Sequence, residues 1–307
     1  MSRAARLEGP DGFVIVDKGS GLTSHDVVAR LRRVLRQRRT GHAGTLDPSA
    51  TGVLVVGVGR ATRLLRYLQD TTKGYEGTLT LGSTTSSLDA DGAVTATFEM
   101  EDIAAADVEQ AASTLTGNLL QVPPMVSAIK VDGRRLHELA REGREVERAP
   151  RPVRVDRFTV APTEDPMRFT FEVVCSSGTY VRSLVDDLGR SLGGGAHLAT
   201  LRRTSVGAFD LHDAKTLEEI EELVGADPGG PEAALLRPVD GLRGMERVEA
   251  GDEATAFIRT GRALEAGVLG AAGPGPFAVI DGHGDLLAVY ERGGEERLVA
   301  AVVLVAT

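Results

Sequence analysis

The chain of 307 residues has one cysteine, no tryptophan and few aromatic side chains of any kind, which make up 4% of the total. A lone cysteine, Cys175, cannot form an intramolecular disulfide, so the sequence favours a reducing compartment and we expect a cytoplasmic protein. We expect no secretory or membrane segment, because no apolar run has the necessary length. A content of 42% hydrophobic and 26% charged residues is typical of a globular protein of one large or two ordinary domains.

Motifs of several other enzyme classes are missing as well. Gly57-Val58-Gly59 lacks the third glycine of a dinucleotide fingerprint, and the sequence has no Gly-Lys-Ser or Gly-Lys-Thr phosphate loop. It has neither a Gly-x-Ser-x-Gly elbow nor a His-Glu-x-x-His motif. The six histidines are scattered, without a partner at metal-ligand spacing. We therefore expect neither a nucleotide cofactor nor a bound metal.

The net charge of −9 argues at first against a nucleic-acid partner, but the acidity is local. Residues 23–73 contain ten Lys or Arg against three Asp, whereas residues 217–307 contain 17 acidic and seven basic residues. The first segment therefore predicts a basic surface that attracts phosphates. An ordinary solvated helix face is the alternative. The predicted patch for binding nucleic-acid phosphates consists of Arg30, Arg33, Arg36 and Arg39.

Hydrophobic periodicity predicts a mixed fold with prominent β content. A helix capped by Thr23 or Ser24 is expected to continue to Leu35 and to carry the arginines. Strands are expected at 12–16, 54–58, 75–81, 93–98, 153–161, 168–175, 277–280, 286–290 and 298–305. Further helices are expected at 61–68, 102–115 and 180–192, the last ended by three glycines.

Residues 39–52, Arg-Thr-Gly-His-Ala-Gly-Thr-Leu-Asp-Pro-Ser-Ala-Thr-Gly, place one carboxylate in a glycine-rich loop. The glycines permit unusual torsions or close approach by a ligand, and Pro48 biases Asp47 toward an extended backbone. Such a segment is also ordinary turn chemistry. It indicates a function only together with its surroundings.

Six segments resemble, in order, the motifs of the TruB family of tRNA pseudouridine synthases. They are 16–24, 42–54, 73–75, 123–130, 175–184 and 198–204. The likeness covers about residues 12–210. The chain departs from the family pattern in the opening motif, where Gly19 replaces the usual proline. It also departs at Val126 and His137, which stand where aromatic residues are common.

The resemblance implies an α+β pseudouridine-synthase fold, with a mixed, mainly antiparallel sheet and flanking helices. It also implies a substrate-gripping insertion at about 121–154 and a small C-terminal β domain of the PUA-like kind. We accordingly expect a catalytic domain over residues 1–245 and a β domain over 246–307. The implied partner is tRNA, modified at uridine 55 of the T loop by a monomeric enzyme without a cofactor or a protein partner.

The resemblance also assigns roles to individual residues. Asp47 would be the catalytic residue, Tyr75 would stack on the flipped base, and Leu201 would complete an apolar wall. Tyr180 and Arg182 would lie beside Asp47, where Arg182 would keep the carboxylate ionised and oriented.

Three more residues take supporting roles in the same way. His42 would fill the space that the flipped base leaves. Lys18 would support the active-site loop, and Lys130 would lie near the substrate.

The chemistry is consistent with an aspartate acting alone. Isomerisation of uridine breaks the N1–C1′ bond and joins C5 to C1′, without redox change. A carboxylate with an ordinary pKa of about 3.9 is ionised at neutral pH and needs no partner base. Asp47 could attack C1′ or C6, or remove the 2′ hydrogen to give a glycal, and the sequence leaves these routes open.

The sequence leaves two other functions open. A retaining glycoside hydrolase also uses a carboxylate at an anomeric carbon, but it needs a second carboxylic acid that the motif around Asp47 does not offer. A non-catalytic RNA-binding or tRNA-folding module on the same scaffold is the other alternative.

Overall fold

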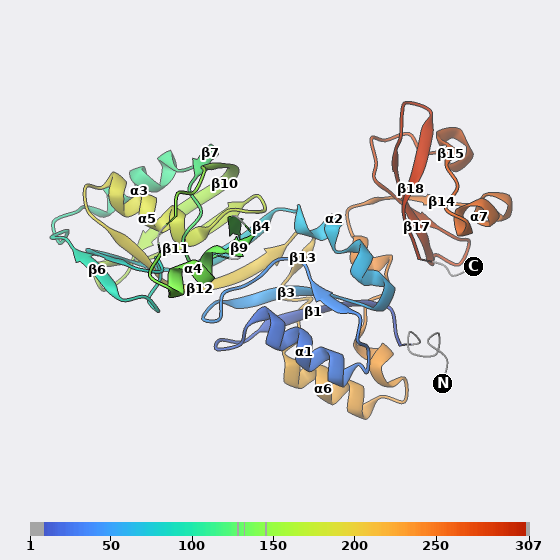
Figure 1. Cartoon of the computed structure of the whole chain (residues 1–307), viewed down its shortest axis with the longest axis horizontal. Helices are drawn as coiled ribbons and strands as arrows, with labels where there is room; N and C mark the ends of the chain where they lie inside the picture. Colours follow the sequence, from blue (N-terminus) through green and yellow to red (C-terminus); the bar gives the residue numbers. More distant parts are fainter. Residues whose placement is uncertain (1–8, 128, 132, 145, 305–307) are drawn as a thin grey trace.

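The computed structural model describes residues 9–127, 129–131, 133–144 and 146–304. It contains a large mixed sheet flanked by helices and a separate small sheet formed by the C-terminal part of the chain (Figure 1). Within these ranges, no helix combines the length and apolar character needed to cross a bilayer. The predicted α+β class is confirmed.

The large sheet has nine strands. Its main path is β1-β3-β12-β4-β11-β10-β7, with β2 paired to β3 and β13 to β12. All described pairs are antiparallel except β3 with β12. The strands are β1 (Gly12–Lys18), β2 (Thr40–His42), β3 (Thr51–Val58), β4 (Lys73–Leu81), β7 (Gly117–Gln121), β10 (Arg151–Pro162), β11 (Arg168–Cys175), β12 (Ala196–Val206) and β13 (Phe209–Asp210).

One half of the sheet is buried on both faces. β1 and β3 are almost continuously apolar, as expected for strands covered on two sides. Helix α1 (Ser24–Val34) begins at a Thr23–Asp26 capping box and packs Val27 and Leu31 against β1 and β3, together with α6 (Leu217–Ala226). Strand β12 then joins this half to the other, where the predicted functional side chains cluster.

The other half is covered by helices on one face only. The helices α3 (Ala105–Thr114) and α5 (Val181–Ser191) bury Leu79 and Phe171 of the sheet with Leu184. Side chains alternate along a strand, so the neighbours of these residues point to the opposite, open face. A short hairpin, β5 (Ser83–Thr85) with β6 (Val94–Thr97), extends this half.

The C-terminal unit is a five-stranded sheet that packs firmly on the rest. One apolar cluster combines Phe13 and Leu242 with Val289 and Val302 of the small sheet. Arg63 also donates to the carbonyl oxygen of Val303 at 2.6 Å. The elements are β14 (Glu246–Glu249), α7 (Asp252–Arg259), β15 (Leu264–Glu265), β16 (Phe277–Ile280), β17 (Leu286–Arg292) and β18 (Arg297–Val303).

Two expected elements differ from the sequence prediction. The helix expected at 61–68 is instead a 3₁₀ segment, η2 (Gly59–Leu64), followed by the single turn α2 (Arg66–Gln69). The predicted insertion contains more regular structure than expected: β8 (Lys130–Val131), β9 (Arg134–Arg135) and α4 (Leu136–Arg141), whose Leu136 and Leu139 are buried. The last residue of the strand expected at 298–305 lies outside the described residues.

Gly52 offers a test of the packing between β3 and β12. Its φ is +101°, and an added Cβ would lie 2.2 Å from the carbonyl oxygen of Arg203. We predict that Gly52→Ala lowers the free energy of unfolding by at least about 2 kcal/mol, because strain and a backbone clash act together. Urea denaturation measures this loss. Gly19→Ala is the control, since nothing lies within 4 Å of its added Cβ; equal stability of the two variants would contradict the prediction.

Candidate active site

Asp47 lies in the loop between β2 and β3, and the first turn of α1 holds this loop. Ser24 accepts a hydrogen bond from the Leu46 amide at 2.9 Å and donates one to the Leu46 carbonyl at 3.2 Å. Asp47 itself accepts at its carbonyl from the Ala50 amide at 3.2 Å, which closes a turn around Pro48. The loop therefore has a defined conformation, as the glycines and Pro48 predict.

Lys18 supports the same loop from below. Its side chain is fully buried, and Nζ donates to the carbonyl oxygens of Gly19, Leu22 and Pro48 at 2.8–3.1 Å. Burial lowers the pKa of Lys18 to about 8, although the negative charge of Asp47 opposes the shift. The lysine thus joins β1 to the residue that follows Asp47.

Arg203 holds both sides of the loop from strand β12. It is 1% exposed, and its Nε donates to the Val53 carbonyl at 2.7 Å while its Nη2 donates to the Gly44 carbonyl at 3.2 Å. Gly44 and Val53 flank Asp47 on the two sides of the loop. A single buried guanidinium therefore fixes the spacing between them.

Arg182 makes the direct contact with Asp47. Arg182 Nε lies 3.0 Å from Oδ2 of Asp47, and Nη2 donates to Oδ1 at 3.3 Å, so the pair is bidentate. The arginine is 4% exposed and its other donors reach the carbonyl oxygens of Ser87 and Val126 at 2.8 and 2.9 Å. It extends from the first turn of α5 and is fixed in place before any substrate binds.

A second carboxylate shares this arginine. Asp89 Oδ2 lies 3.5 Å from Arg182 Nη1. The sequence motif offered no second acid near Asp47, and this prediction is wrong. Asp89 also accepts hydrogen bonds from the Ser87 hydroxyl and the Asp91 amide. Surrounded by donors, Asp89 is placed as a hydrogen-bond acceptor, which does not suit the proton donor of a glycoside hydrolase.

The protonation of Asp47 is set by opposing influences. Burial raises the pKa of the Asp47 carboxyl above its ordinary value of 3.8, Arg182 and Lys18 oppose the rise, and Asp89 adds to it. The unperturbed pKa assumed from the sequence is therefore too low. With 39% of its side chain exposed, the carboxylate remains within reach of a substrate.

Asp47 lies between two hollows. An inner cavity of about 270 Å³ is on the side of α5. Five predicted site residues line it: Asp47, Tyr75, Tyr180, Arg182 and Leu201. Tyr180 is fixed there because the buried Gln121 amide donates to its carbonyl at 3.1 Å and accepts from its amide at 2.8 Å.

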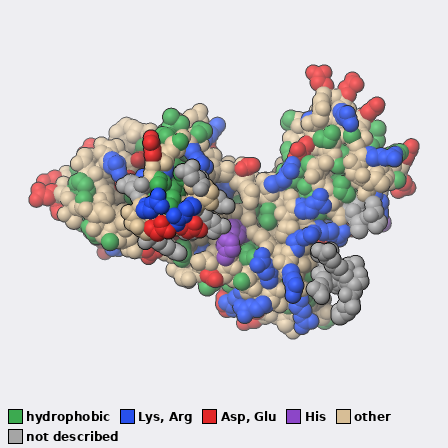
Figure 2. Space-filling view, viewed as in Figure 1, with side chains coloured by type: hydrophobic (Ala, Val, Ile, Leu, Met, Phe, Trp, Pro, Cys, Tyr) green, Lys and Arg blue, Asp and Glu red, His purple; other side chains and the backbone are tan. Residues whose placement is uncertain are grey.

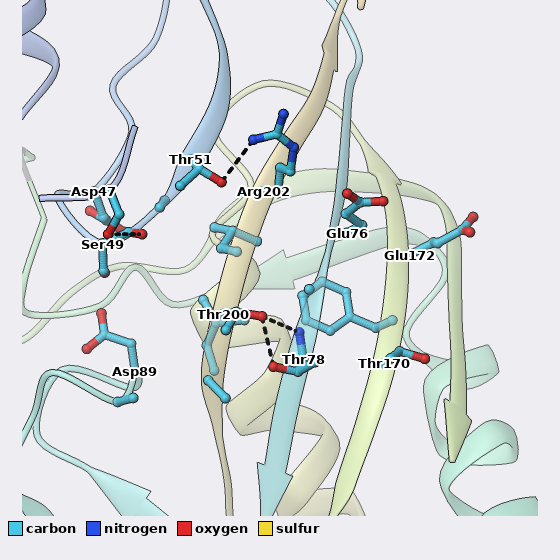
Figure 3. A pocket seen from close by; sticks show the side chains of 18 of the residues that line it. Asp47, Ser49, Thr51, Glu76, Thr78, Asp89, Thr170, Glu172, Thr200 and Arg202 are labelled. Atoms are coloured by element: carbon cyan, nitrogen blue, oxygen red, sulfur yellow. Dashed lines mark hydrogen bonds between the residues drawn. The ribbon is translucent and has the colours of Figure 1, made fainter. Parts of the chain in front are cut away.

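An outer groove of about 910 Å³ lies on the open face of the sheet. Figure 3 shows Asp47 and Asp89 on one side of strand β12, and Glu76 and Glu172 on its other side. The groove is thus acidic as well as wide. The inner cavity, in contrast, has Lys73, Arg182 and Arg203 in its walls.

The remaining predicted site residues do not line the inner cavity. His42, on β2, makes an edge-to-face contact with His25 at 5.5 Å, and its Nδ1 is buried. Burial and the neighbouring His25 lower the pKa of His42. Lys18 lies beneath the loop. Lys130 is in β8, and its side chain lies outside the described residues.

The predicted arginine patch is only partly free. Arg33, Arg36 and Arg39 are exposed, whereas Arg30 pairs with Glu218 and Glu221 of α6 at 2.8 and 2.6 Å. Figure 2 shows Lys and Arg side chains gathered over the lower body and toward the C-terminal unit, with acidic side chains at the outer tips and in a group near the middle of the left half.

The main residues that sequence analysis missed are Asp89 and Arg203. The signal for Asp89 was the polar turn Ser87-Leu88-Asp89-Ala90-Asp91, in which Leu88 has a φ of +65°. Arg203 was part of a recognised motif, but a buried arginine cannot be distinguished from an exposed one by spacing alone.

Two family models match the chain. The model of the TruB family pseudouridylate synthase N-terminal domain matches residues 32–181, and that of the tRNA pseudouridylate synthase B C-terminal domain matches residues 182–242. A solved Cbf5-Nop10-Gar1 complex contains a chain with a TM-score of 0.75 at 24% identity, over 99% of this chain and 87% of that one. This likeness supports the fold.

Sequence relatives span nearly the whole chain. The tRNA pseudouridine synthase B of Mycobacteroides abscessus is 44% identical over 300 residues, covering 95% of this chain and 96% of that protein. The protein of the same name from Rhodococcus jostii is 46% identical over 305 residues, covering 96% and 95%. With such relatives over its full length, and with the motif residues gathered around one carboxylate, the chain belongs to the TruB family of pseudouridylate synthases.

Proposed function

We propose that this pseudouridine synthase converts uridine 55 in the T loop of tRNA, with Asp47 as its catalytic residue. The observation that carries the proposal is the bidentate Arg182–Asp47 pair at the edge of a cavity lined by Tyr75, Tyr180 and Leu201. It orients a carboxylate toward a space bounded by aromatic and apolar side chains. The names of the relatives support tRNA as substrate.

A uridine in a folded tRNA arm is stacked, so it must leave the stack to reach this cavity, at a cost of a few kcal/mol. Tyr75 offers a ring for stacking with the flipped base, and Leu201, on the neighbouring strand β12, adds an apolar side chain to the cavity wall. His42 lies on β2 outside the inner cavity, where an imidazole can fill the space that the base leaves in the RNA.

The exposed arginines give the binding surface. Arg33, Arg36 and Arg39 make a basic field beside α1, and η2 continues it toward the C-terminal unit. Arg36 adopts a φ of +51°, which is uncommon for a residue other than glycine. Its side chain is exposed, where it can contact a phosphate. The enzyme acts as a monomer in the cytoplasm in this proposal.

Replacement of Asp47 tests the catalytic assignment. We predict that Asp47→Asn lowers tritium release from C5-labelled tRNA by at least ~10⁴-fold, the scale of losing a central catalytic group. Binding of tRNA should persist, because the side chains are nearly isosteric. Asp91→Asn, which removes an exposed carboxylate of the outer groove, is the matched control and should stay active. Undiminished release by Asp47→Asn would instead favour a non-catalytic tRNA-folding role.

The pH dependence of the reaction gives a second prediction. The reaction needs ionised Asp47, and the pKa of Asp47 is raised, so the rate should fall as the pH decreases through a midpoint above 3.8. Asp89→Asn removes a negative charge that raises this pKa, so the midpoint should move to lower pH. Single-turnover rates across the acid range measure both. A midpoint that moves to higher pH would contradict the assignment.

The arginine surface is tested by salt dependence. We predict that Arg33→Glu with Arg36→Glu weakens tRNA binding and reduces the slope of log K against log salt by roughly 2, about one unit per lost phosphate contact. Filter binding at several salt concentrations measures the slope. Arg168→Glu is the control, because Arg168 is exposed at the start of β11 and pairs with Asp165. An equal slope for both variants would exclude this surface.

A further inference from the structure

Two buried cations, Lys73 and Arg203, meet in the wall of the inner cavity. Lys73 is 6% exposed and Arg203 1%, and both line the cavity together with Tyr75. Their side chains converge beneath Gly44, since a Cβ added there would lie 3.7 Å from both Lys73 Cε and Arg203 Nη1. They come from adjacent strands, β4 and β12, paired through Tyr75 and Arg203.

Neither cation forms an ion pair with a carboxylate among the described residues. Lys73 Nζ donates to the carbonyl oxygens of Gln69 and Thr71 at 2.8 and 2.9 Å. Arg203 donates to the carbonyl oxygens of Val53 in β3 and Gly44 in the loop. Carbonyl oxygens satisfy hydrogen bonds without cancelling charge. An ammonium group has three donors, and the described partners account for two of those of Lys73.

Burying two cations without a carboxylate partner lowers the stability of the folded protein, so packing alone does not explain them. Buried Lys and Arg side chains are rarely left without a counter-charge, because desolvation of each charge is unfavourable. Burial and the nearby Arg203 lower the pKa of Lys73 to about 8, so it stays mainly protonated at pH 7. The cavity wall therefore has a net positive charge before substrate binds.

We infer that Lys73 and Arg203 stabilise the negative charge that the uracil ring acquires when its bond to the ribose breaks. The N1–C1′ bond breaks with its electron pair passing to the ring, which spreads the negative charge over N1 and both carbonyl oxygens and leaves C1′ electron-deficient until C5 supplies the pair for the new bond. After the ring turns, C5 bonds to C1′, the C5 proton passes to water and N1 takes a proton from water. Fixed cations at the cavity wall favour the anion most when its charge is largest.

This role differs from those of the other two buried cations. Arg182 is neutralised by Asp47 and Asp89, so its field on the base is reduced. Lys18 has three carbonyl partners and does not line the inner cavity. The inference rests on the proposed function, and it adds the electrostatic partner of the departing base.

The test compares two substrates with different leaving groups. Transcripts of tRNA are assembled with either uridine or 5-fluorouridine at position 55; fluorine makes the departing base more acidic, so it needs less stabilisation. We predict that Lys73→Met slows single-turnover conversion of uridine by ~10²-fold, the scale of losing one donor to a developing anion. The loss on 5-fluorouridine should be at least ~10-fold smaller. After C5 of 5-fluorouridine bonds to C1′, there is no C5 proton to lose, and water adds to the N1=C6 bond instead. Disappearance of the starting nucleoside after nuclease digestion, followed by chromatography, therefore measures both rates.

Lys18→Met is the matched control. It removes another buried lysine bonded to carbonyls, so a purely structural defect should slow both substrates equally. Lys73→Gln, which keeps a donor for one carbonyl, repeats the comparison if Lys73→Met does not fold. An equal loss on both substrates in the Lys73 variants overturns the inference and leaves the proposed function standing. Failure of the unsubstituted protein to convert uridine overturns the proposed function itself.

Discussion

The bidentate contact between Arg182 and Asp47 is the interaction on which the site depends. Arg182 is almost completely buried, and its guanidinium also reaches Asp89, the carbonyl of Ser87 and the carbonyl of Val126. One side chain thereby joins α5, the loop that contains Asp47, the turn after β5 and the start of the insertion. Loss of any of these partners would leave a buried charge poorly satisfied, which is expensive in a low dielectric. The geometry around Asp47 is therefore determined by contacts from several segments that are far apart in the sequence.

The loop is held mainly through backbone carbonyls. Lys18 and Arg203 donate to carbonyl oxygens on either side of Asp47 and bring no second carboxylate with them. A carboxylate in the same place would compete with Asp47 for the cations and raise its pKa further. Carbonyl partners give the loop rigidity while the local charge stays positive. The same arrangement recurs at Lys73, which converges with Arg203 beneath Gly44 and donates to the carbonyl oxygens of Gln69 and Thr71.

Much of the fold and the site follows from local sequence. Periodicity predicts α1 and nine of the eighteen strands in the described part of the chain, but not β12, which joins the two halves of the large sheet. Glycine with proline predicts the defined loop around Asp47. Local sequence does not predict that Asp89 joins the site or that Arg203 is buried, because both depend on contacts between segments far apart in the chain. Local sequence also does not predict that the helix expected at 61–68 divides into the 3₁₀ segment η2 and the turn α2. This division depends on the packing of η2 against β3 and the C-terminal unit. The spacing of residues predicts which side chains lie on the same face of a helix or strand. Tertiary packing determines which other side chains they contact.

The charge distribution explains how an acidic chain can accept RNA on one side of Asp47. The inner cavity and the α1 surface have cations, while Glu76, Asp89, Asp91 and Glu172 line the outer groove. A phosphate that entered the groove would meet several negative charges at short range, where screening by salt is weak. The same polyanion is attracted on the basic side. The net charge of −9 thus conceals a directional field, and Asp47 stands where its sign changes.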